Sequence, residues 1–445
     1  MQAYSEYKES NIPWLGKVPK HWRLLPCRAI VDNQVEKNEG AEIQEYLSLM
    51  ANIGVIRYED KGDVGNKKPD DLGKCKIVKR GNLVINSMNY AIGSYGMSSY
   101  DGVCSPVYIV LEPNESFVER RFALRLFENK PMQKHLALLG NGILEHRAAI
   151  KWDDIKPQHV PVPPLEEQKA ILDFLDRETA RIDNLIAEKQ AFINLLKEKR
   201  QALISHVVTK GLDPNVKMKD SGVEWIGEVP EHWDVLLHRR LINTIEQGWS
   251  PQADSNPPND NQWGVTKLSA VKSGSFYPSE CKAMLDEHDP SKGLSVNEGD
   301  FLITRANTPE LVGDVCIVGN LDGRKIILCD LIYKLSYDKT TNPRYMMYWF
   351  LGQPARAQIK IDARGSSMTM AKIAQSHIKN WKIPVPPIEE QAHAVAYLDK
   401  ILSKLYSISK EVEASIEYLR EHRTALISAA VTGKIDVRNQ KEKAT

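Results

Sequence analysis

Few stretches of this 445-residue sequence could carry out chemistry. Amino-methyltransferases hold a flipped base with an Asn/Asp-Pro-Pro sequence followed by an aromatic residue, and "SNPPND" at residues 255–260 comes close to that pattern. Asn259 occupies the aromatic position, and no Gly-rich strand–turn–helix precedes the stretch to bind a cofactor. We therefore interpret the stretch as a surface loop.

The other catalytic signals are weaker still. No GxxxxGK[ST] sequence exists to cradle ATP phosphates. Glu128-x-Lys130 could form part of a nuclease metal site, but no suitably placed Asp precedes it. The six cysteines are scattered singly, without a CxxC pair or a neighbouring His cluster, which argues against zinc and against a disulfide framework. We expect free thiols in a reducing cytosol, no metal site and no catalytic centre in this chain.

Composition limits the class of protein. Hydrophobic residues make up 42% of the chain, which is typical of globular proteins. A chain of 445 residues is long enough for two to four domains. Lys plus Arg total 59 against 58 for Asp plus Glu, so nucleic acid cannot be bound by bulk charge, although a local basic face could bind it. The first residues do not form a signal peptide, and no run of 18 apolar residues predicts a membrane span.

The sequence contains an internal duplication. "KESNIPWLGKVPKHW" (8–22) returns as "KDSGVEWIGEVPEHW" (219–233) at an offset of 211. "PVPPLEEQ" (161–168) returns as "PVPPIEEQ" (384–391), and the offset of 223 persists to the paired "ALIS" stretches at 202 and 425. Between these anchors only traces match, such as "GNLVINS" (81–87) with "GDFLITR" (299–305) and "CSPVYIV" (104–110) with "CDLIYKL" (329–335). A duplicated enzyme would repeat catalytic residues, whereas the identical positions here are scaffold types such as Pro, Trp and Gly, so framework and variable domains should alternate.

Each half ends in a predicted long helix. Two prolines and two glutamates begin it, which suits a first helical turn and the positive end of the helix dipole. About 40 residues without Pro or Gly follow, with apolar residues at the 3.5-residue period of a coiled-coil seam. The seam residues are Leu172, Leu175, Ile182, Ile186, Ile193, Leu196, Leu203 in the first helix and Val395, Leu398, Leu402, Leu405, Val412, Ile416, Leu419, Leu426 in the second. The alternative is that each helix packs only on its neighbouring domain.

Connection lengths predict the orientation of the two helices. Only about 20 residues separate the first helix from the second variable domain, so parallel helices would need a longer return. We expect an antiparallel pair with one domain at each end and a pseudo-twofold axis.

These repeated motifs resemble the specificity subunit of type I restriction–modification enzymes. The resemblance covers the whole chain and rests on the "IPWLGKVPKHW" and "WIGEVPEHW" openings and on the two "PVPP[LI]EEQ" helices. It implies an α+β fold with two tandem target-recognition domains of mixed α/β structure, separated by two long antiparallel coiled-coil helices. It also implies double-stranded DNA, methyltransferase subunits (two of them) and restriction subunits as partners. AdoMet, ATP and Mg would then belong to the partner subunits, with no cofactor in this chain.

The predicted organisation has seven segments. They are an N-terminal framework segment (1–22), target-recognition domain 1 (23–158), a central helix (159–212), a framework repeat (213–233), target-recognition domain 2 (234–381), a C-terminal helix (382–436) and a polar tail (437–445).

Candidate base-reading residues are polar residues in predicted loops of the variable domains. Arg can bond guanine in a bidentate manner, and Asn can bond adenine likewise. The candidates are Asn86, Ser87, Asn89, His146, Arg147 and Lys151 in the first half, and Gln247, Trp249, Arg305, Asn307, Ser366, Ser367, Thr369 and Lys372 in the second. For any single one, an ordinary solvated loop residue is an equally good interpretation.

We therefore expect a non-catalytic, cytoplasmic DNA-specificity subunit that binds a bipartite, asymmetric target and recruits methyltransferase and restriction subunits. One alternative is a stand-alone adenine-N6 DNA methyltransferase that recognises a split site. Another is a coiled-coil scaffold that does not bind DNA.

Overall fold

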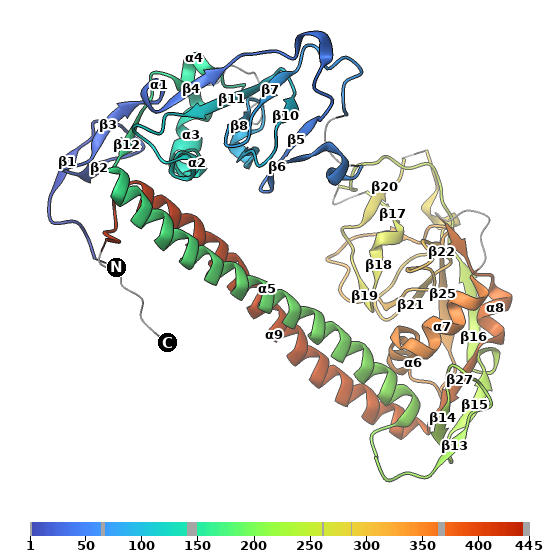
Figure 1. The fold of residues 1–445 in the computed structure, drawn as a ribbon. Coiled ribbons are helices and arrows are strands. Elements are labelled where there is room, and N and C mark those ends of the chain that lie inside the picture. The colour runs from blue at the N-terminus through green and yellow to red at the C-terminus, as the bar shows by residue number, and fades with distance from the viewer. Residues whose placement is uncertain are drawn as a thin grey trace. The chain divides into compact units, whose positions relative to one another are not determined.

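The computed structural model describes residues 2–63, 67–139, 149–259, 262–285, 287–363 and 370–438 (Figure 1). The chain divides into two compact units. Unit 1 comprises Met1–Lys189 and Ala414–Thr445, and unit 2 comprises Gln190–Glu413. Both units contain part of each long helix.

Among its described residues, unit 1 combines short strands with four short α-helices and one end of each long helix. Its strands are β1 (Tyr7–Glu9), β2 (Lys17–Pro19), β3 (Arg23–Pro26), β4 (Val31–Gln34), β5 (Leu47–Met50), β6 (Gly54–Arg57), β7 (Lys76–Val78), β8 (Leu83–Asn86), β9 (Tyr95–Met97), β10 (Gly102–Cys104), β11 (Tyr108–Pro113) and β12 (His159–Val162). Its short helices are α1 (Cys27–Ile30), α2 (Arg120–Glu128), α3 (Lys130–Leu139) and α4 (Trp152–Ile155), and the long helices are α5 (Leu165–Lys210) and α9 (Ile388–Val431).

Unit 2 repeats this order with different connections. Its strands are β13 (Met218–Asp220), β14 (Glu228–Pro230), β15 (Asp234–Leu237), β16 (Ile242–Gln247), β17 (Gly264–Thr266), β18 (Val271–Lys272), β19 (Ser275–Phe276), β20 (Cys281–Ala283), β21 (Phe301–Thr304), β22 (Ala306–Asn307), β23 (Val315–Ile317), β24 (Ile326–Ile327), β25 (Ile332–Tyr337), β26 (Ala371–Lys372) and β27 (Lys382–Val385). Its short helices are α6 (Pro343–Leu351), α7 (Gln353–Asp362) and α8 (Gln375–Asn380).

The central sheets of the two units have the same topology. Unit 1 has the strand order β4-β11-β8-β9, and unit 2 has β16-β25-β21-β23, each antiparallel throughout. In both units a short strand before the long helix pairs with the strand after the His-Trp motif, as β12 with β3 and β27 with β15. The predicted helical segments 159–212 and 382–436 therefore each begin with a strand.

The strand registers correct one match made from sequence. "GNLVINS" and "GDFLITR" do align, as β8 and β21, but Tyr108 pairs with Asn86 whereas Ile332 pairs with Thr304. The equivalent of Tyr333 is thus Ile109, one residue beyond Tyr108. Side chains alternate between the faces of a strand, so a one-residue slip exchanges the faces. Ile109 packs in the main core of unit 1 as Tyr333 does in that of unit 2, whereas Tyr108 packs in a smaller cluster on the other side.

Each long helix begins at its Pro-Pro pair, as the sequence predicts, and ends near a glycine. Each starts directly after its Pro-Pro pair, and Gln168 N donates to Pro164 O at 2.9 Å in the first turn of α5. Both end at a glycine in the left-handed region, Gly211 (φ +76°) after α5 and Gly433 (φ +73°) after α9. A glycine adopts this conformation without the steric cost of a side chain, which explains the helix stops.

The predicted seam is the inward face of the helices in each unit. All fifteen seam residues are buried or half-buried. In unit 1, Leu172, Leu175 and Ile182 of α5 share a core cluster with Leu426 of α9. In unit 2, Val395 and Leu398 of α9 share a cluster with Ile204 and Val207 of α5. Within each unit the early part of one helix thus meets the late part of the other, so the helices are antiparallel.

The repeated His-Trp and Glu-Gln motifs are explained by contacts between them. Trp22 is fully buried and donates from Nε1 to Glu167 Oε1 at 3.0 Å, and His21 Nε2 lies 2.7 Å from Glu167 Oε2. In unit 2, Trp233 and His232 make the same contacts with Glu390 at 2.9 and 2.7 Å. The motifs recur because each helix start is fixed to its own framework.

The glutamine of each motif fixes the loop before α2 or α6. Buried Gln168 donates from Nε2 to Phe117 O and Pro163 O, both at 2.9 Å, and accepts from Glu119 N at 2.8 Å. Buried Gln391 makes the equivalent three bonds in unit 2. Because buried polar groups are costly unless hydrogen-bonded, few other residues could replace this side chain.

The two ends of the described chain meet in unit 1. Gln2 and Asp436 form an antiparallel bridge, with Asp436 N donating to Gln2 O at 2.8 Å. An antiparallel helix pair with one domain at each end brings these two residues together, so the bridge agrees with the predicted orientation.

Candidate nucleic-acid interface

Two candidates of the first half are buried, Asn86 at the end of β8 and Ser87 directly after it. Asn86 Oδ1 accepts from Met88 N at 3.1 Å, and Ser87 Oγ donates to Val107 O at 2.9 Å. Both side chains are less than 10% exposed. They shape the loop from within, and we do not retain them as base-reading candidates.

Asn89 and Lys151 lie on the surface of the same region. Both side chains are exposed. Ile150 N donates to Ser87 O at 3.1 Å, which joins the loop after β8 to the segment before α4. Two stretches more than 60 positions apart in sequence therefore converge, as expected if they act on one ligand.

Unit 2 contains the same convergence. Ile373 N donates to Arg305 O at 2.9 Å, and Ile373 and Arg305 are the equivalents of Ile150 and Ser87. β22 and β26 extend the contact, with Asn307 paired to Ala371 and Ala306 to Lys372. Asn307 Oδ1 accepts from Thr308 N, whereas the Lys372 side chain is exposed.

The Arg305 side chain is held at this edge by weak contacts. Its Nη1 donates to Asp330 O at 3.4 Å, and its Cζ lies 5.9 Å from the centre of the Tyr333 ring. Burial raises the pKa of Tyr333, and the positive charge of Arg305 opposes that rise. Arg305 is half-buried, and its contacts with described residues use only part of its five donors.

Gln247 reaches the same carbonyl from a different strand. Its Nε2 donates to Asp330 O at 3.1 Å, so Gln247 and Arg305 meet at one point. Trp249 instead packs against the small core around Val265 and stacks edge-on to His288. We interpret Trp249 as part of the core rather than as a base contact. The candidates His146, Arg147, Ser366, Ser367 and Thr369 lie outside the described residues.

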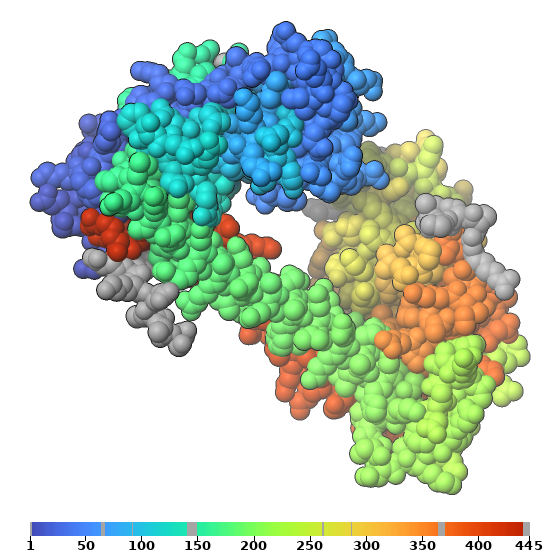
Figure 2. All heavy atoms as spheres, viewed as in Figure 1, coloured from blue at the N-terminus to red at the C-terminus, as the bar shows by residue number. Residues whose placement is uncertain are grey.

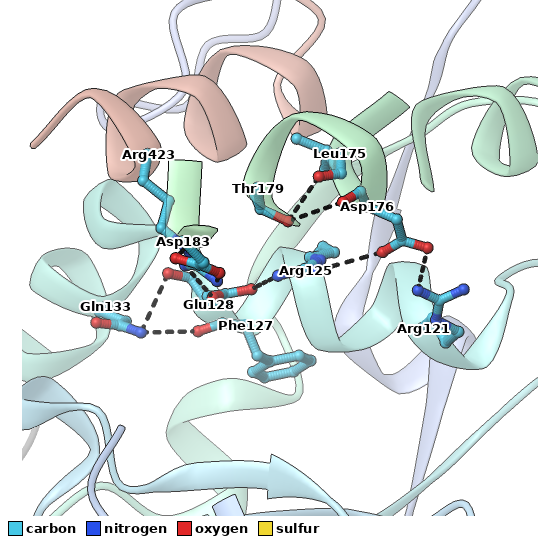
Figure 3. Close-up of polar contacts among 10 residues, drawn as sticks. All are labelled: Arg121, Arg125, Phe127, Glu128, Gln133, Leu175, Asp176, Thr179, Asp183 and Arg423. Atoms are coloured by element: carbon cyan, nitrogen blue, oxygen red, sulfur yellow. Dashed lines mark hydrogen bonds and ion pairs between the residues drawn. The ribbon is translucent and has the colours of Figure 1, made fainter. Parts of the chain in front are cut away.

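Sequence reasoning missed the polar network where α2 meets both long helices in unit 1 (Figure 3). Arg423 Nε donates to Asp183 Oδ1 at 3.0 Å, and its Nη1 lies 3.7 Å from Glu128 Oε1. Arg125 Nη1 donates to the other oxygen of Glu128 at 2.5 Å. Glu128 is thus occupied by two arginines, and Lys130 donates to Gln133. The apparent Glu-x-Lys nuclease signal consists of structural contacts. The polar seam position of Arg423 was the available clue.

Other signs of catalysis are weak in the described part of the chain. The "SNPPN" residues that the structure describes form an exposed or half-exposed loop between a bridge at Ala253 and β17. All six cysteines are free and buried, and burial raises the pKa of the Cys27 and Cys281 thiols to about 12. Among described residues, no three His, Cys, Asp or Glu side chains come together as metal ligands. No helix in the same residues has the length and apolarity to cross a membrane.

Known proteins resemble this chain over most of its length. A putative type I restriction enzyme specificity subunit, MjaX, from Methanocaldococcus jannaschii is 25% identical over 97% of this chain and 98% of its own length. The EcoKI specificity subunit of Escherichia coli K12 is 23% identical over 67% of this chain and 63% of its own.

Two solved structures share the fold. A chain from work on complex assembly and conformational transition of the type I R-M system superposes with a TM-score of 0.69, at 16% identity, over 94% of this chain and 99% of its own. The HsdS subunit of Thermoanaerobacter tengcongensis gives a TM-score of 0.52, also at 16% identity, over 96% of this chain and 100% of its own. The α+β fold with two tandem domains and long helices is thus confirmed.

The decisive match is to a protein family defined as the type I restriction modification DNA specificity domain. It covers residues 36–195 and again residues 254–418, one match in each half of the duplication. The chain belongs to this family of DNA specificity domains, which is non-catalytic, and carries the domain twice.

Proposed function

We propose that this protein selects the DNA sequence on which a type I restriction–modification complex acts. The observation that carries the proposal is the convergence, in both units, of the loop after the β8 or β21 strand with the segment before α4 or α8. The framework around that point is repeated, but the residues at the point differ: Asn89 and Lys151 in unit 1, Arg305 and Lys372 in unit 2. A shared frame that presents different donors suits two different half-sites of one bipartite target.

The helices carry features that suit two equivalent protein partners. Leu185 and Tyr418 in unit 1 are 37% and 68% exposed, although both are apolar and lie outside the seam. Their equivalents in unit 2, at the constant offset of 223, are Ile408 (38% exposed) and Leu195 (59%). Part of the α5 surface is visible in the space-filling view (Figure 2). Exposed apolar residues at matched positions favour protein–protein contact.

The register of the helices brings each pair close along the helix axis. In unit 1 the Asp183–Arg423 contact aligns the two antiparallel helices. Leu185 lies two residues after Asp183 on α5, and Tyr418 lies five residues before Arg423 on α9. Because the helices are antiparallel, both residues are displaced from the Asp183–Arg423 contact in the same direction along the helix axis, Leu185 by about 3 Å and Tyr418 by about 8 Å. We assign this pair and its unit 2 equivalent to two methyltransferase subunits, with restriction subunits joining through them. AdoMet, ATP and Mg are assigned to those partners, and the complex to the cytoplasm.

The stand-alone methyltransferase makes a different prediction. It would bind AdoMet by itself, whereas a specificity subunit would not. The family match and the loop character of residues 255–259 favour the specificity subunit.

The test is the methylation pattern of genomic DNA from the source cell with and without this gene. We expect a split sequence with two unlike halves to lose methylation in the deletion strain. Complementation by the intact gene should restore it, and the purified chain should show no AdoMet binding by calorimetry. An unchanged methylation pattern would refute the proposal, and restored methylation by this chain without any partner gene would favour the methyltransferase.

A further inference from the structure

The loop after β21 in unit 2 is attached to the protein at its start and again near its end. We call residues 305–313 the unit 2 loop. Near its start, Asn307 of β22 pairs with Ala371 of β26. Near its end, Thr304 Oγ1 donates to Leu311 O at 3.2 Å. The exposed residues of the loop, which we call the crest, are Thr308, Pro309, Glu310 and Leu311. The crest therefore directly follows the base-reading candidate Asn307.

Arg356 of α7 holds the end of the crest from outside the loop. Its Nη1 donates to Val312 O at 2.7 Å, and its Nη2 donates to Glu310 O at 2.9 Å. The planar fork of the guanidinium thus binds two carbonyl groups of the loop at the same time. Hydrogen bonds from a charged donor are also roughly twice as strong as neutral ones. The path of the backbone at the crest therefore depends on Arg356.

A buried acid beside Arg356 joins the end of the loop to a second segment. Asp314 directly follows the loop, and its carboxylate accepts from Ser273 N at 2.8 Å and from Val315 N at 2.9 Å. Burial raises the pKa of Asp314, and the positive charge of Arg356 is one of the influences that oppose this rise. Burial lowers the pKa of Arg356, and the negative charge of Asp314 opposes that shift. The two opposite charges therefore stabilise each other at the end of the loop.

The helix that carries Arg356 is itself fixed to the long helix α5. Gln353 N, at the start of α7, donates to Ser205 Oγ at 2.9 Å. Gln201 Nε2 donates to Leu351 O, at the end of α6, at 2.7 Å. Arg356 lies less than one helical turn after Gln353. A group that recognises a ligand must be held within about 0.5 Å of its productive geometry, and these contacts give the crest support of that kind.

Unit 1 supports its equivalent loop in another way. At the offset of 223, Gln133 takes the place of Arg356, and its Nε2 donates to Phe127 O at 3.1 Å and to Glu128 O at 3.3 Å. The loop after β8 is held instead by its own buried Tyr90, whose hydroxyl donates to Phe127 O at 2.5 Å. In unit 1 a loop residue reaches the end of α2, whereas in unit 2 a residue of α7 reaches the loop. The two loops are therefore anchored by different residues.

We propose that Arg356 is a positioning residue for the half-site that unit 2 reads: it holds the crest so that the loop meets the bases in one geometry. This inference rests on the proposed function, and it names a residue that affects specificity without touching DNA. The competing explanation is a direct contact of Arg356 with a DNA phosphate, which predicts a different salt dependence.

The test compares variants of the full-length chain in the assembled complex. The probes are a duplex with the sequence that the wild type selects from a randomised library, and duplexes with one base pair changed in either half-site. Arg356→Gln places the unit 1 residue at this position, where its amide can bond the end of α6 as Gln133 bonds the end of α2. Because glutamine has neither the length nor the charge of arginine, the crest loses its anchor. We expect discrimination against a changed base pair to fall by about tenfold in the unit 2 half-site, the worth of one well-placed base contact, and to stay within about twofold in the other half-site.

Three further variants sharpen the comparison. Arg356→Lys should restore part of the discrimination, because the charge returns without the planar fork. Lys360→Ala removes only an exposed ion pair with the Glu310 side chain and is the matched control on α7, with discrimination kept within about twofold. Tyr90→Phe removes the hydroxyl that anchors the unit 1 loop and should lower discrimination in the other half-site alone.

Salt dependence separates positioning from direct contact. Removing a phosphate contact weakens binding to all sequences alike and lowers the slope of log affinity against log salt by ~1. We expect Arg356→Gln to leave this slope unchanged. A lower slope with unchanged discrimination would overturn the positioning role.

The outcomes also separate the inference from the function on which it rests. Unchanged discrimination in both half-sites of Arg356→Gln, or equal loss in both, would overturn the inference alone. Arg356→Met, which keeps an unbranched chain without the charge, decides in the same way if the glutamine variant does not assemble. Failure of both variants to assemble would make Arg356 a residue of the fold rather than of recognition. A wild-type complex that selects no DNA sequence would refute the proposed function and the inference together.

Discussion

Unit 1 and unit 2 have the same four-stranded sheet but different structures in the connections between its strands. Between β4 and β8, unit 1 has the β5–β6 hairpin and β7, which pairs antiparallel with β10. Between β16 and β21, unit 2 has the β18–β19 hairpin and β17, which pairs antiparallel with β20 and parallel with β24. The framework is thus constant while the insertions have different topologies.

Each insertion packs on the other face of the central sheet, in a hydrophobic cluster separate from the main core of its unit. Leu47, Val55 and Val78 belong to a separate cluster in unit 1, and Val265, Cys281 and Ile327 to one in unit 2. The glutamate of each unit bonds to the His-Trp motif and the glutamine to the loop before α2 or α6, so none of these described bonds involves the insertions. An insertion can therefore change without disturbing the helix attachment, which is what a protein needs if its target changes while its partners stay the same.

The largest expected effect tests the constancy of the framework. Trp22→Ala and Trp233→Ala each remove a fully buried indole and one of the hydrogen bonds that hold the glutamate at the start of the long helix. We expect a loss of ~3–5 kcal/mol in the affected unit, seen as faster hydrogen exchange in that unit alone. Trp14→Ala and Trp225→Ala, at half-buried matched positions, are the controls and should cost less. Strongly unequal losses from the two buried tryptophans would show that the frameworks are not equivalent.

A smaller effect tests the divergence of the variable parts. Arg305→Ala should weaken discrimination at one half-site by ~1–3 kcal/mol, the worth of a bidentate base contact, and Asn89→Ala should act on the other half-site. Selection from a randomised DNA library by the assembled complex measures both. Arg305→Lys should keep affinity but lose discrimination, because lysine has no planar fork. Equal loss at both half-sites, or no loss, would exclude Arg305 as a base-reading residue.

Much of the fold could be predicted because the repeated motifs are local and strict. Pro-Pro before a helix, a glycine after it and a 3.5-residue apolar period each have one simple structural meaning, and the residues of the predicted seam from Leu172 to Leu426 are all buried or half-buried. The match of Tyr108 with Tyr333 was wrong because two tyrosines beside a cysteine resemble each other in sequence, whereas the pairing register that separates them is set by the neighbouring strand.

The candidate site was harder to predict because exposure depends on tertiary contacts. Asn86 ends the apolar strand β8 and Arg305 directly follows the apolar strand β21. Asn86 is nevertheless buried and accepts from Met88 N, whereas Arg305 is half-buried and donates to Asp330 O. The polar network at Arg423 joins residues from three helices that are up to 295 positions apart, so no short motif could reveal it. A comparison of equivalent positions at the fixed offset shows the difference between the units: Arg423 contacts Asp183, whereas unit 2 has Tyr406 at the position equivalent to Asp183.

The smallest expected effect concerns the connection between the end of a long helix and the first β-hairpin of a unit, which is continuous in unit 2 and lies between the chain ends in unit 1. In unit 2 the segment after Gly211 leads through exposed residues around Asn215 to β13, and Glu231 N donates to Lys217 O at 2.8 Å. In unit 1 the matching contact joins Lys20 N to Glu6 O at 3.0 Å, and the bridge between Gln2 and Asp436 holds the two ends together without a covalent link. A short linker joining the ends, with new termini opened at Asn215, therefore adds the missing connection in unit 1 and removes the equivalent connection in unit 2.

Because exposed polar loops tolerate permutation, we expect the permuted chain to melt within a few degrees of the wild type and to select the same DNA sequence. A control permuted inside α5, next to buried Leu196, should fail to fold. Loss of folding on opening at Asn215 would mean that the covalent connection in unit 2, unlike its open counterpart in unit 1, is required to hold α5 against the framework.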